Sequence, residues 1–390
     1  MLEFKLAYRN LVRAGLRTWL KVAVLSLSYV LITWHYGFFS GMYKQISRAM
    51  IGDEIAGGQY WHKNYDPFDP MSLDDGHGVI PAELEVLIRE KKAVPILVRQ
   101  ASIFPEGRVQ SVLLKGIDPG QRVIRIPTAK LETEESVLPI LVGRRMAKSN
   151  SLKIGDYIMI RWRDAHGTFD AIEGKIVEIM STQVPTIDSR QLWIPLKNLQ
   201  KMSGLGNEST IIVVDKDVSG RTDLPDWNFK NLDFLLKDVN DMVRSKRISG
   251  GIMYFILLFL AMLAVFDTQI LSVFRRRKEI GTLMALGMTR SKVISLFTLE
   301  GALIGILAAG VAVIYGTPLI YFTATKGILF PEMVEEYGFA ISRRLFPAYS
   351  VGLVLGTVII IMVTTTIVSY LPTRKISKLK PTEALKGKIS

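Results

Sequence analysis

Residues 275–292 read RRRKEIGTLMALGMTRSK and lie between two long apolar segments of the chain. The four cations that open this stretch exclude it from the hydrocarbon core of a membrane. Apolar and small residues then recur at spacings of three and four and share one helical face: Ile280, Leu283, Met284 and Gly287. The pattern predicts a short amphipathic helix on a basic loop. Two interpretations are open, a docking surface for another protein and an ordinary positively charged loop without a partner.

The composition indicates a membrane protein with a sizeable water-exposed part. The chain has 390 residues, of which 49% are hydrophobic and 22% charged, and its formal net charge is +13. This mixture is too apolar for an ordinary soluble enzyme and too charged for a protein made only of membrane spans.

The excess positive charge is concentrated in three short segments beside apolar runs. Residues 1–21 carry a net charge of +4, and residues 275–292 and 374–390 carry +5 each, whereas residues 44–247 carry only +1. Such a distribution is typical of the positive-inside rule and not of a nucleic-acid-binding face. It predicts cytoplasmic N- and C-termini, a large extracytoplasmic domain and no nucleic-acid partner.

Sequence signatures of catalysis are missing from the 390 residues. There is no cysteine, and the four histidines (His35, His62, His77 and His166) do not have metal-ligand spacing. No P-loop, no G-x-S-x-G and no H-E-x-x-H occurs. We therefore expect a non-catalytic chain that binds no cofactor or metal of its own.

The predicted fold class is a membrane α-helical protein with four transmembrane helices and a large extracytoplasmic α/β plus β domain between the first two. The predicted segments follow in chain order: an amphipathic cytoplasmic helix at 1–21, a first span at 22–43, the periplasmic domain with its stalk helices at 44–247, a second span at 248–274, the cytoplasmic basic loop at 275–298, a third span at 299–325, a short periplasmic loop at 326–344, a fourth span at 345–373 and a cytoplasmic tail at 374–390.

Three details within the spans carry expectations of their own. An unbroken helix from 231 to 274 would be roughly 65 Å long and would project as a stalk, with Gly250–Gly251 as the predicted interruption. Gly37 and Gly41 are spaced to admit another helix, although glycines near a helix end are an equally good explanation. Asp267 is an intramembrane carboxylate, and its closeness to the basic loop favours a snorkelling or capping role over a functional one.

The motifs together resemble the FtsX-like permease family of ABC transporter membrane subunits, which includes macrolide-exporter-type and lipoprotein-releasing permeases. The resemblance is carried by residues 277–294 with 300–305 (EGALIG), by 7–11 (AYRNL) and 381–385 (PTEAL), and in the large domain by 114–119 (LKGIDP), 142–147 (VGRRMA) and 153–156 (KIGD). The size of the large domain is most similar to that of lipoprotein-releasing permeases.

The resemblance implies that the amphipathic helix docks on an ABC ATPase subunit, present in two copies, which holds ATP and magnesium. The implied coupling residues are Arg277, Glu279, Ile280, Gly281, Leu283, Met284, Leu286, Gly287 and Arg290. It further implies a second permease, identical or homologous, and glycines in the third and fourth spans that serve packing within each subunit.

The resemblance also implies a function, namely ATP-driven extraction of lipoproteins from a bacterial inner membrane, with a periplasmic carrier as a further partner. A substrate path between the first two spans would involve Phe38, Phe39, Met42, Phe255, Phe259 and Met262. Two alternatives stay open: an efflux or peptide-export permease that works with an outer-membrane duct, and a non-transporting signalling module that activates a periplasmic enzyme.

Overall fold

The computed structural model of the chain describes residues 15–133, 137–182, 184–218, 223–329 and 344–374. They form two units, one from the described parts of 1–42, 242–329 and 344–390 and one from those of 43–241. The predicted amphipathic helix before residue 15, most of the 326–344 loop, the tail from residue 375 and the motifs at 7–11 and 381–385 lie outside the described residues.

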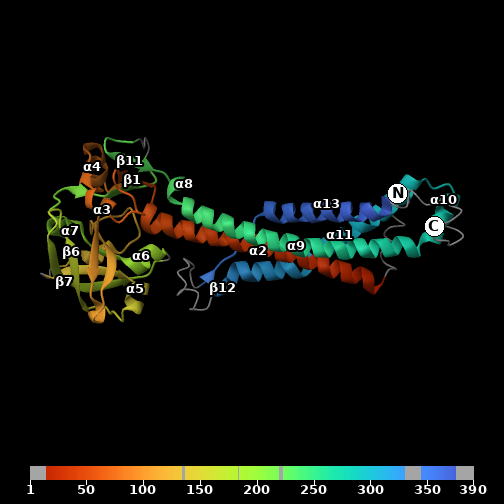
Figure 1. Ribbon diagram of the computed structural model, residues 1–390, viewed down its shortest axis with the longest axis horizontal. Helices are drawn as coiled ribbons and strands as arrows, with labels where there is room; N and C mark the ends of the chain where they lie inside the picture. The colour runs from red at the N-terminus through yellow and green to blue at the C-terminus, as the bar shows by residue number, and fades with distance from the viewer. Residues whose placement is uncertain (1–14, 134–136, 183, 219–222, 330–343, 375–390) are drawn as a thin grey trace. The chain divides into compact units, whose positions relative to one another are not determined.

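Four helices dominate the first unit (Figure 1), and each is long and apolar enough to cross a membrane. They are α2 (Leu16–Met50), α9 (Lys237–Arg275), α11 (Arg290–Lys326) and α13 (Val351–Thr373). By length and composition, the described residues thus contain the four predicted candidate spans. A short ladder of β12 (Ile328–Leu329) and β13 (Arg344–Leu345) precedes α13.

Apolar side chains from all four helices meet in one core, and a few polar contacts fix their register. The fully buried members include Leu25 of α2, Ala308 of α11 and Ile361 of α13. The Tyr29 hydroxyl of α2 donates a 3.4 Å hydrogen bond to the carbonyl of Gly305 in α11. Gly301 allows close approach of α11 and α13, because a Cβ at this position would overlap the Ser369 side chain.

The predicted interruption of the long helix at Gly250–Gly251 is wrong. Helix α9 runs through both glycines without a break, and the chain is instead interrupted at Leu236, between α9 and the short α8 (Leu232–Leu235). Asn231 caps α8 by accepting a hydrogen bond from the Phe234 amide. Gly250 is needed for packing, since a Cβ there would overlap the imidazole of His35.

The neighbour of Gly37 and Gly41 also differs from the predicted one. A Cβ on either glycine would overlap the segment 346–349, which leads from β13 into α13, so no helix fills this space. The Ala348 amide donates a 2.9 Å hydrogen bond to the carbonyl of Gly37. The small residues therefore admit an extended segment whose backbone bonds directly to the helix.

Packing within the chain accounts for only some of the glycines in α11 and α13. Gly301 and Gly305 face α13, whereas a Cβ on Gly310, Gly352 or Gly356 would meet no atom within 4 Å. The expectation that the glycines of these two helices pack within the subunit is thus correct for the first two and wrong for the last three.

The second unit is built on a nine-stranded sheet that partly closes on itself. The strands are β1 (Gly58–His62), β3 (Ala93–Ile103), β4 (Gln110–Ile117), β5 (Leu138–Gly143), β6 (Tyr157–Arg163), β7 (Phe169–Met180), β8 (Gln191–Pro195), β10 (Ile211–Val214) and β11 (Trp227–Lys230). Their order is β11-β1-β10-β3-β4-β8-β5-β7-β6, and an additional β3–β6 pairing closes the last six into a ring. The long β3 makes this possible, because Ala93–Ile96 pair with β10 and Ala101–Ile103 with β6.

Short elements connect and cover these strands. They are the π-helix η1 (Ile51–Ile55), α3 (Ser72–Asp75), β2 (Gly78–Val79), α4 (Ala82–Arg89), η2 (Pro105–Gly107), η3 (Thr128–Leu131), α5 (Arg144–Ser149), α6 (Pro185–Arg190), α7 (Leu196–Ser203) and β9 (Glu208–Ser209). Among the strands of the described residues, only β4–β8 and β5–β7 pair in parallel. The predicted strand-rich character is thus confirmed, whereas the α/β character is limited to these two pairs.

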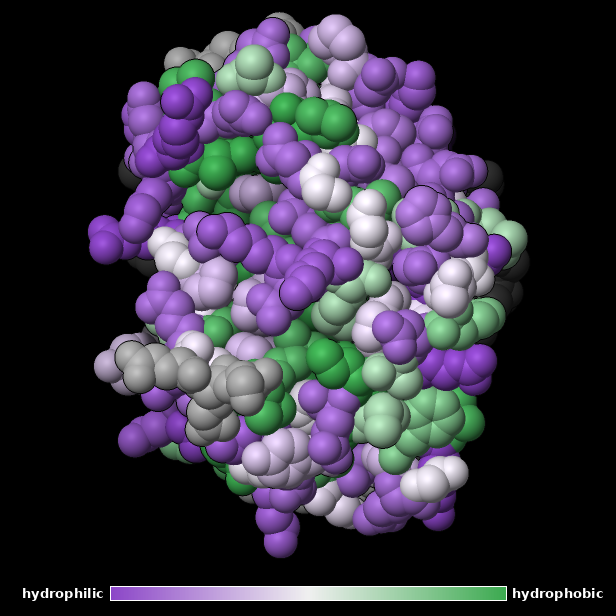
Figure 2. Space-filling view, turned by 90° about the vertical axis from the view of Figure 1, so that its left-hand side faces the viewer, coloured by the Kyte–Doolittle hydropathy of each residue, from purple (hydrophilic) through white to green (hydrophobic). Residues whose placement is uncertain are grey.

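Alternating residues fill the interior of the ring. In β6, Ile158, Ile160 and Trp162 are buried while the residues between them are exposed, the pattern of a strand with one face toward a core. Ile140 from β5 and Ile176 from β7 belong to the same interior cluster and are fully buried. Figure 2 shows that hydrophilic side chains predominate on one outer face of this unit, as expected for a domain in water.

One buried ion pair fastens α6 to α5. Arg145 Nε lies 3.2 Å from Asp188 Oδ2, and the Arg145 backbone amide donates to the other carboxylate oxygen. Burial raises the pKa of the Asp188 carboxyl, and the hydrogen bonds and charges of Arg144 and Arg145 oppose that rise. Gly143 leaves room for this contact, because a Cβ there would overlap the Asp188 backbone.

Candidate functional site

The amphipathic stretch folds as a small helical hairpin between two of the long helices. Helix α10 (Arg277–Ala285) follows α9 after a single residue, and α11 begins at Arg290, inside the predicted basic loop. A Schellman-type turn ends α10, with the Met288 amide bonded to the Leu283 carbonyl and the Gly287 amide to the Met284 carbonyl. Gly287 has φ +95°, a conformation that glycine adopts without strain.

One face of α10 packs into its own chain. Ile280 is fully buried in a cluster with Val273 of α9 and with Val293 and Phe297 of α11, and Met284 packs against the edge of this cluster. Ile280 and Met284 are one turn apart, as an amphipathic helix requires. The apolar stripe that suggested a docking face therefore fixes α10 to α9 and α11.

Arg276 connects the start of α10 to α11. Its Nε lies 2.8 Å from Glu279 Oε2, its Nη1 lies 3.1 Å from Glu300 Oε2, and its guanidinium stacks 4.9 Å from the Phe297 ring centroid. Glu300 is only 8% exposed, so the pair lies largely out of water. Charge-assisted hydrogen bonds of this kind are strong and directional. We call Arg276, Glu279, Glu300 and Phe297 the Arg276 brace.

The structure divides the predicted coupling residues into two groups. Ile280 and Gly281 are buried and present no surface to a partner in this conformation, so their coupling role stays a prediction. Leu283 and Met284 are half-buried, and the side chain of Arg277 lies outside the described ones. The exposed group is Glu279, Leu286, Gly287 and Arg290, and Leu286 is 80% exposed at the tip of the turn.

The predicted substrate-path residues are divided in the same way. Phe255 and Phe259 of α9 are 68% and 54% exposed, and Phe38 and Phe39 of α2 are half-buried. Met262 lies in the helix core and Met42 is buried as well, so neither methionine offers a free surface. His35 joins the group through ring contacts with Phe39 and Tyr254, at centroid distances of 4.9 and 4.5 Å.

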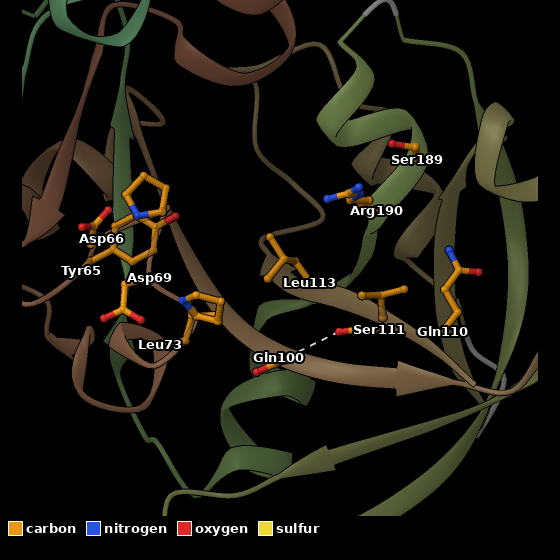
Figure 3. A pocket seen from close by; sticks show the side chains of 13 residues that line it. Tyr65, Asp66, Asp69, Leu73, Gln100, Gln110, Ser111, Leu113, Ser189 and Arg190 are labelled. Carbon is orange, nitrogen blue, oxygen red and sulfur yellow. Dashed lines mark hydrogen bonds between the residues drawn. The ribbon is translucent and has the colours of Figure 1, made fainter. Parts of the chain in front are cut away.

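Sequence reasoning missed the Arg276 brace and a cavity of about 500 Å³ in the sheet unit (Figure 3). A signal for the brace was present, since Glu300 is a lone carboxylate at the head of an apolar span that follows a run of cations. The cavity lies among the 64–76 loop, β4 and α6, and Asp66, Asp69 and Arg190 are among its lining residues. Its parts come from distant segments, so nothing in the sequence indicates that they meet.

No group of three or more His, Cys, Asp or Glu side chains among the described residues could hold a metal ion. Asp267 is exposed on α9 and forms no hydrogen bond or ion pair with another described residue.

Comparison with known proteins shows that the Arg276 brace lies inside a segment that matches a permease family. The FtsX-like permease C-terminal family matches residues 251–381. An uncharacterized ABC transporter permease from Methanocaldococcus jannaschii is 28% identical over 33% of this chain and 30% of its own length. The macrolide export ATP-binding/permease protein MacB is 27% identical in Sodalis glossinidius and 24% in Escherichia coli, over 47% and 46% of this chain and 26% of each relative.

These matches show that the C-terminal third of the chain is similar to membrane subunits of the ABC transporter permease type. More particularly, residues 251–381 match the FtsX-like permease C-terminal family, and MacB proteins and an ABC transporter permease are among the proteins that resemble the chain in sequence. The chain spans about a quarter to a third of the length of the curated relatives it matches. The predicted closeness to lipoprotein-releasing permeases stays a prediction.

Among solved structures, the extracellular domain of the noncanonic ABC-type transporter YknZ from Gram-positive bacteria matches 42% of this chain and 84% of its own. The identity is 13% and the TM-score 0.25.

Proposed function

We propose that this chain is the membrane subunit of an ABC transporter, and that an ATPase outside residues 1–390 docks on the tip of the α10 hairpin. The observation that carries the proposal is the combination of an FtsX-like domain with an exposed Leu286 on a hairpin that is braced from within. ATP and magnesium would be held by the ATPase, in two copies. The transporter would contain a second permease, identical or homologous, in a bacterial inner membrane with both termini cytoplasmic.

The geometry suits the transmission of force. Because Ile280 and the Arg276 brace tie α10 to both α9 and α11, a push on the hairpin tip moves two long helices and not a loose loop. Helix α9 continues from this hairpin to Lys237 as one 39-residue element. An ATPase that changes shape on binding ATP could therefore act on residues far from its own surface.

Leu286→Asp tests the docking surface. Leu286 has little internal contact to lose, so we expect a folded permease that no longer copurifies with its ATPase, with binding weakened at least tenfold. The test position is better than Gly287, whose positive φ would strain any substituted backbone. The measurement is copurification of the ATPase with affinity-tagged permease from membranes.

Phe68→Asp is the matched control for this variant. Phe68 is also a large apolar residue that is 80% exposed, and it lies in the sheet unit. Equal loss of ATPase in both variants would point to a general effect of the added carboxylate. Full binding by Leu286→Asp would remove the hairpin tip from the proposed interface.

For the cargo, we propose that a lipidated protein is released from the outer leaflet. The exposed aromatic face of α9 around Phe255 and Phe259 offers an apolar surface of the kind that acyl chains require. Macrolide or peptide export is the second candidate, and it is favoured by the two relatives named as macrolide export proteins.

Photocrosslinking separates these cargoes. A photoreactive amino acid at Phe255 or Phe259 should trap a lipoprotein in living cells, whereas the same group at Ile359 of α13, which is 61% exposed, should trap only lipid. Adducts with a labelled macrolide or an exported peptide would establish the second candidate instead. Adducts with a periplasmic hydrolase alone would favour the signalling module and sink both transport functions.

A further inference from the structure

A cavity of about 520 Å³ lies among α2, α9 and α11, and its wall combines apolar surface with charged and hydroxyl side chains that the proposed function does not use. Its wall carries three cations, Lys21, Arg275 and Arg276, together with the hydroxyls of Thr18 and Ser272. A single carboxylate, that of Glu300, belongs to the lining. The cavity is therefore equipped with the donor groups that bind phosphate.

The charges of the cavity do not cancel. Glu300 is already engaged by Arg276 at 3.1 Å, and Arg276 also pairs with Glu279. The Lys21 side chain forms no hydrogen bond or ion pair with a described residue, but it lies close enough to Glu300 to be attracted by that carboxylate. The side chain of Arg275 has no such partner among the described residues. Three cations thus face one carboxylate in the cavity wall, so a net positive charge is left to attract an anion, and Lys21 and Arg275 supply it from two different helices.

The position of the cavity indicates which anion this is. Thr18 and Lys21 precede the uncharged run 22–43 and Arg275 follows the apolar run 248–274, so the cavity lies where two predicted spans end. The positive-inside pattern assigns this end to the cytoplasmic side, where anionic phospholipids are concentrated. Leu271, half exposed beside the cations, adds an apolar wall on the membrane side.

We infer that this cavity binds the phosphate group of an anionic phospholipid from the cytoplasmic leaflet. The phosphate oxygens accept hydrogen bonds from Lys21 of α2 and Arg275 of α9, and the hydroxyls of Thr18 and Ser272 are available as further donors. The acyl chains remain in the bilayer beside Leu271. The lipid joins α2 to α9 next to Arg276, and thus stabilises the helices to which α10 is attached.

The test measures lipid binding by the full-length chain in detergent, with native mass spectrometry and thermal unfolding as readouts. The probes are phosphatidylglycerol, phosphatidylcholine of the same acyl composition, and inorganic phosphate. We expect phosphatidylglycerol to bind and to raise the unfolding temperature more than phosphatidylcholine does. Lys21→Gln and Arg275→Gln should each weaken phosphatidylglycerol binding about fivefold.

Two further variants distinguish the loss of the binding site from misfolding of the chain. Lys21→Arg retains the charge and should bind phosphatidylglycerol as the wild type does. Lys278→Gln removes one exposed cation from the same basic segment but not from the cavity, and should bind unchanged. A loss in Lys278→Gln equal to that in Lys21→Gln would mean diffuse surface attraction and would overturn the site.

Comparison of the three probes gives two further outcomes that would contradict the inference. Equal binding of phosphatidylcholine and phosphatidylglycerol would reduce the cavity to an apolar crevice and would contradict the inference. If inorganic phosphate stabilises the chain and phosphatidylglycerol adds no further effect, the cavity binds a soluble phosphate. That result would overturn the inference that it binds a phospholipid. None of these results depends on the ATPase or the cargo, so the inference and the proposed function fail separately.

Discussion

Ile140→Ala is expected to destabilise the sheet unit by about 2–5 kcal/mol, the range for a buried isoleucine truncated in a core. Ile140 is fully buried inside the six-stranded ring. Its side chain occupies the space beside Gly174 of β7, where even a Cβ would overlap it. Because glycine has no side chain that could move into the gap, the cavity left by the truncation would stay open.

The measurement is urea unfolding of the full-length chain in detergent, followed by tryptophan fluorescence. Four of the six tryptophans (Trp61, Trp162, Trp193 and Trp227) lie in the sheet unit, and Trp162 belongs to the same core cluster as Ile140. Ile172→Ala in β7 is the matched control, since Ile172 is 37% exposed and should cost less than about 1 kcal/mol.

A second substitution tests whether the open cavity beside Gly174 causes the loss of stability. In Ile140→Ala combined with Gly174→Ala, the new methyl group would enter the space that the isoleucine has left, and part of the lost stability should return. No recovery, or an equal loss in Ile172→Ala, would contradict the closed ring as the source of the effect.

The six-stranded ring contains one feature that the sequence predicts and one that it does not. The alternation in β6 is visible in the sequence and predicts a strand with one buried face. The pairing of Ala101 in β3 with Trp162 in β6 is not visible, because it joins segments some sixty residues apart, and only the assembled sheet brings them together. Strand content could therefore be predicted, whereas closure could not.

The four spans could be predicted because length, hydropathy and charge distribution are local properties of a sequence. Gly250 shows the limit of such local reasoning. Glycine weakens an isolated helix, and two consecutive glycines therefore predict an interruption. The contact with His35 overrides this preference, since α2 and α9 could not approach as closely with any larger residue.

The amphipathic helix of the candidate site could be predicted from the sequence, whereas the neighbours of its apolar face could not. The spacing of Ile280 and Met284 showed an amphipathic helix, and a sequence cannot say whether an apolar stripe meets another protein or its own chain. In the structure the stripe packs against Val293 and Phe297 of α11, and Leu286 is exposed. The sequence of α10 does not indicate which residues of α9 and α11 its apolar side chains contact.

Arg276→Met is expected to uncouple the hairpin from α11, with a local cost of about 3 kcal/mol. Removing one partner of a buried ion pair typically costs 3–5 kcal/mol, because the other charge is left without compensation. Glu300 would be in this position, with 8% of its surface exposed. The lower end of the range is appropriate here, because Lys21 lines the same cavity and could partly compensate for the lost cation.

Hydrogen–deuterium exchange of the α10 amides measures this cost directly. An opening that is easier by about 3 kcal/mol corresponds to roughly hundredfold faster exchange. Lys278→Met is the control, since it removes a neighbouring cation that is exposed. Unchanged protection of α10 in Arg276→Met would show that Ile280 and its neighbours hold the hairpin without the brace.

The double variant Arg276→Met with Glu300→Gln distinguishes two causes of the destabilisation. One is the uncompensated charge of Glu300, and the other is the lost stacking of Arg276 on Phe297. If the cost comes from an uncompensated carboxylate, neutralising Glu300 should restore most of the protection of α10 even though the ion pair is absent. If the cost comes from the lost stacking of Arg276 on Phe297, the second substitution should recover nothing. Should protection return while stimulation of ATP hydrolysis does not, the Arg276 brace would be required for transmission and not only for the stability of the hairpin.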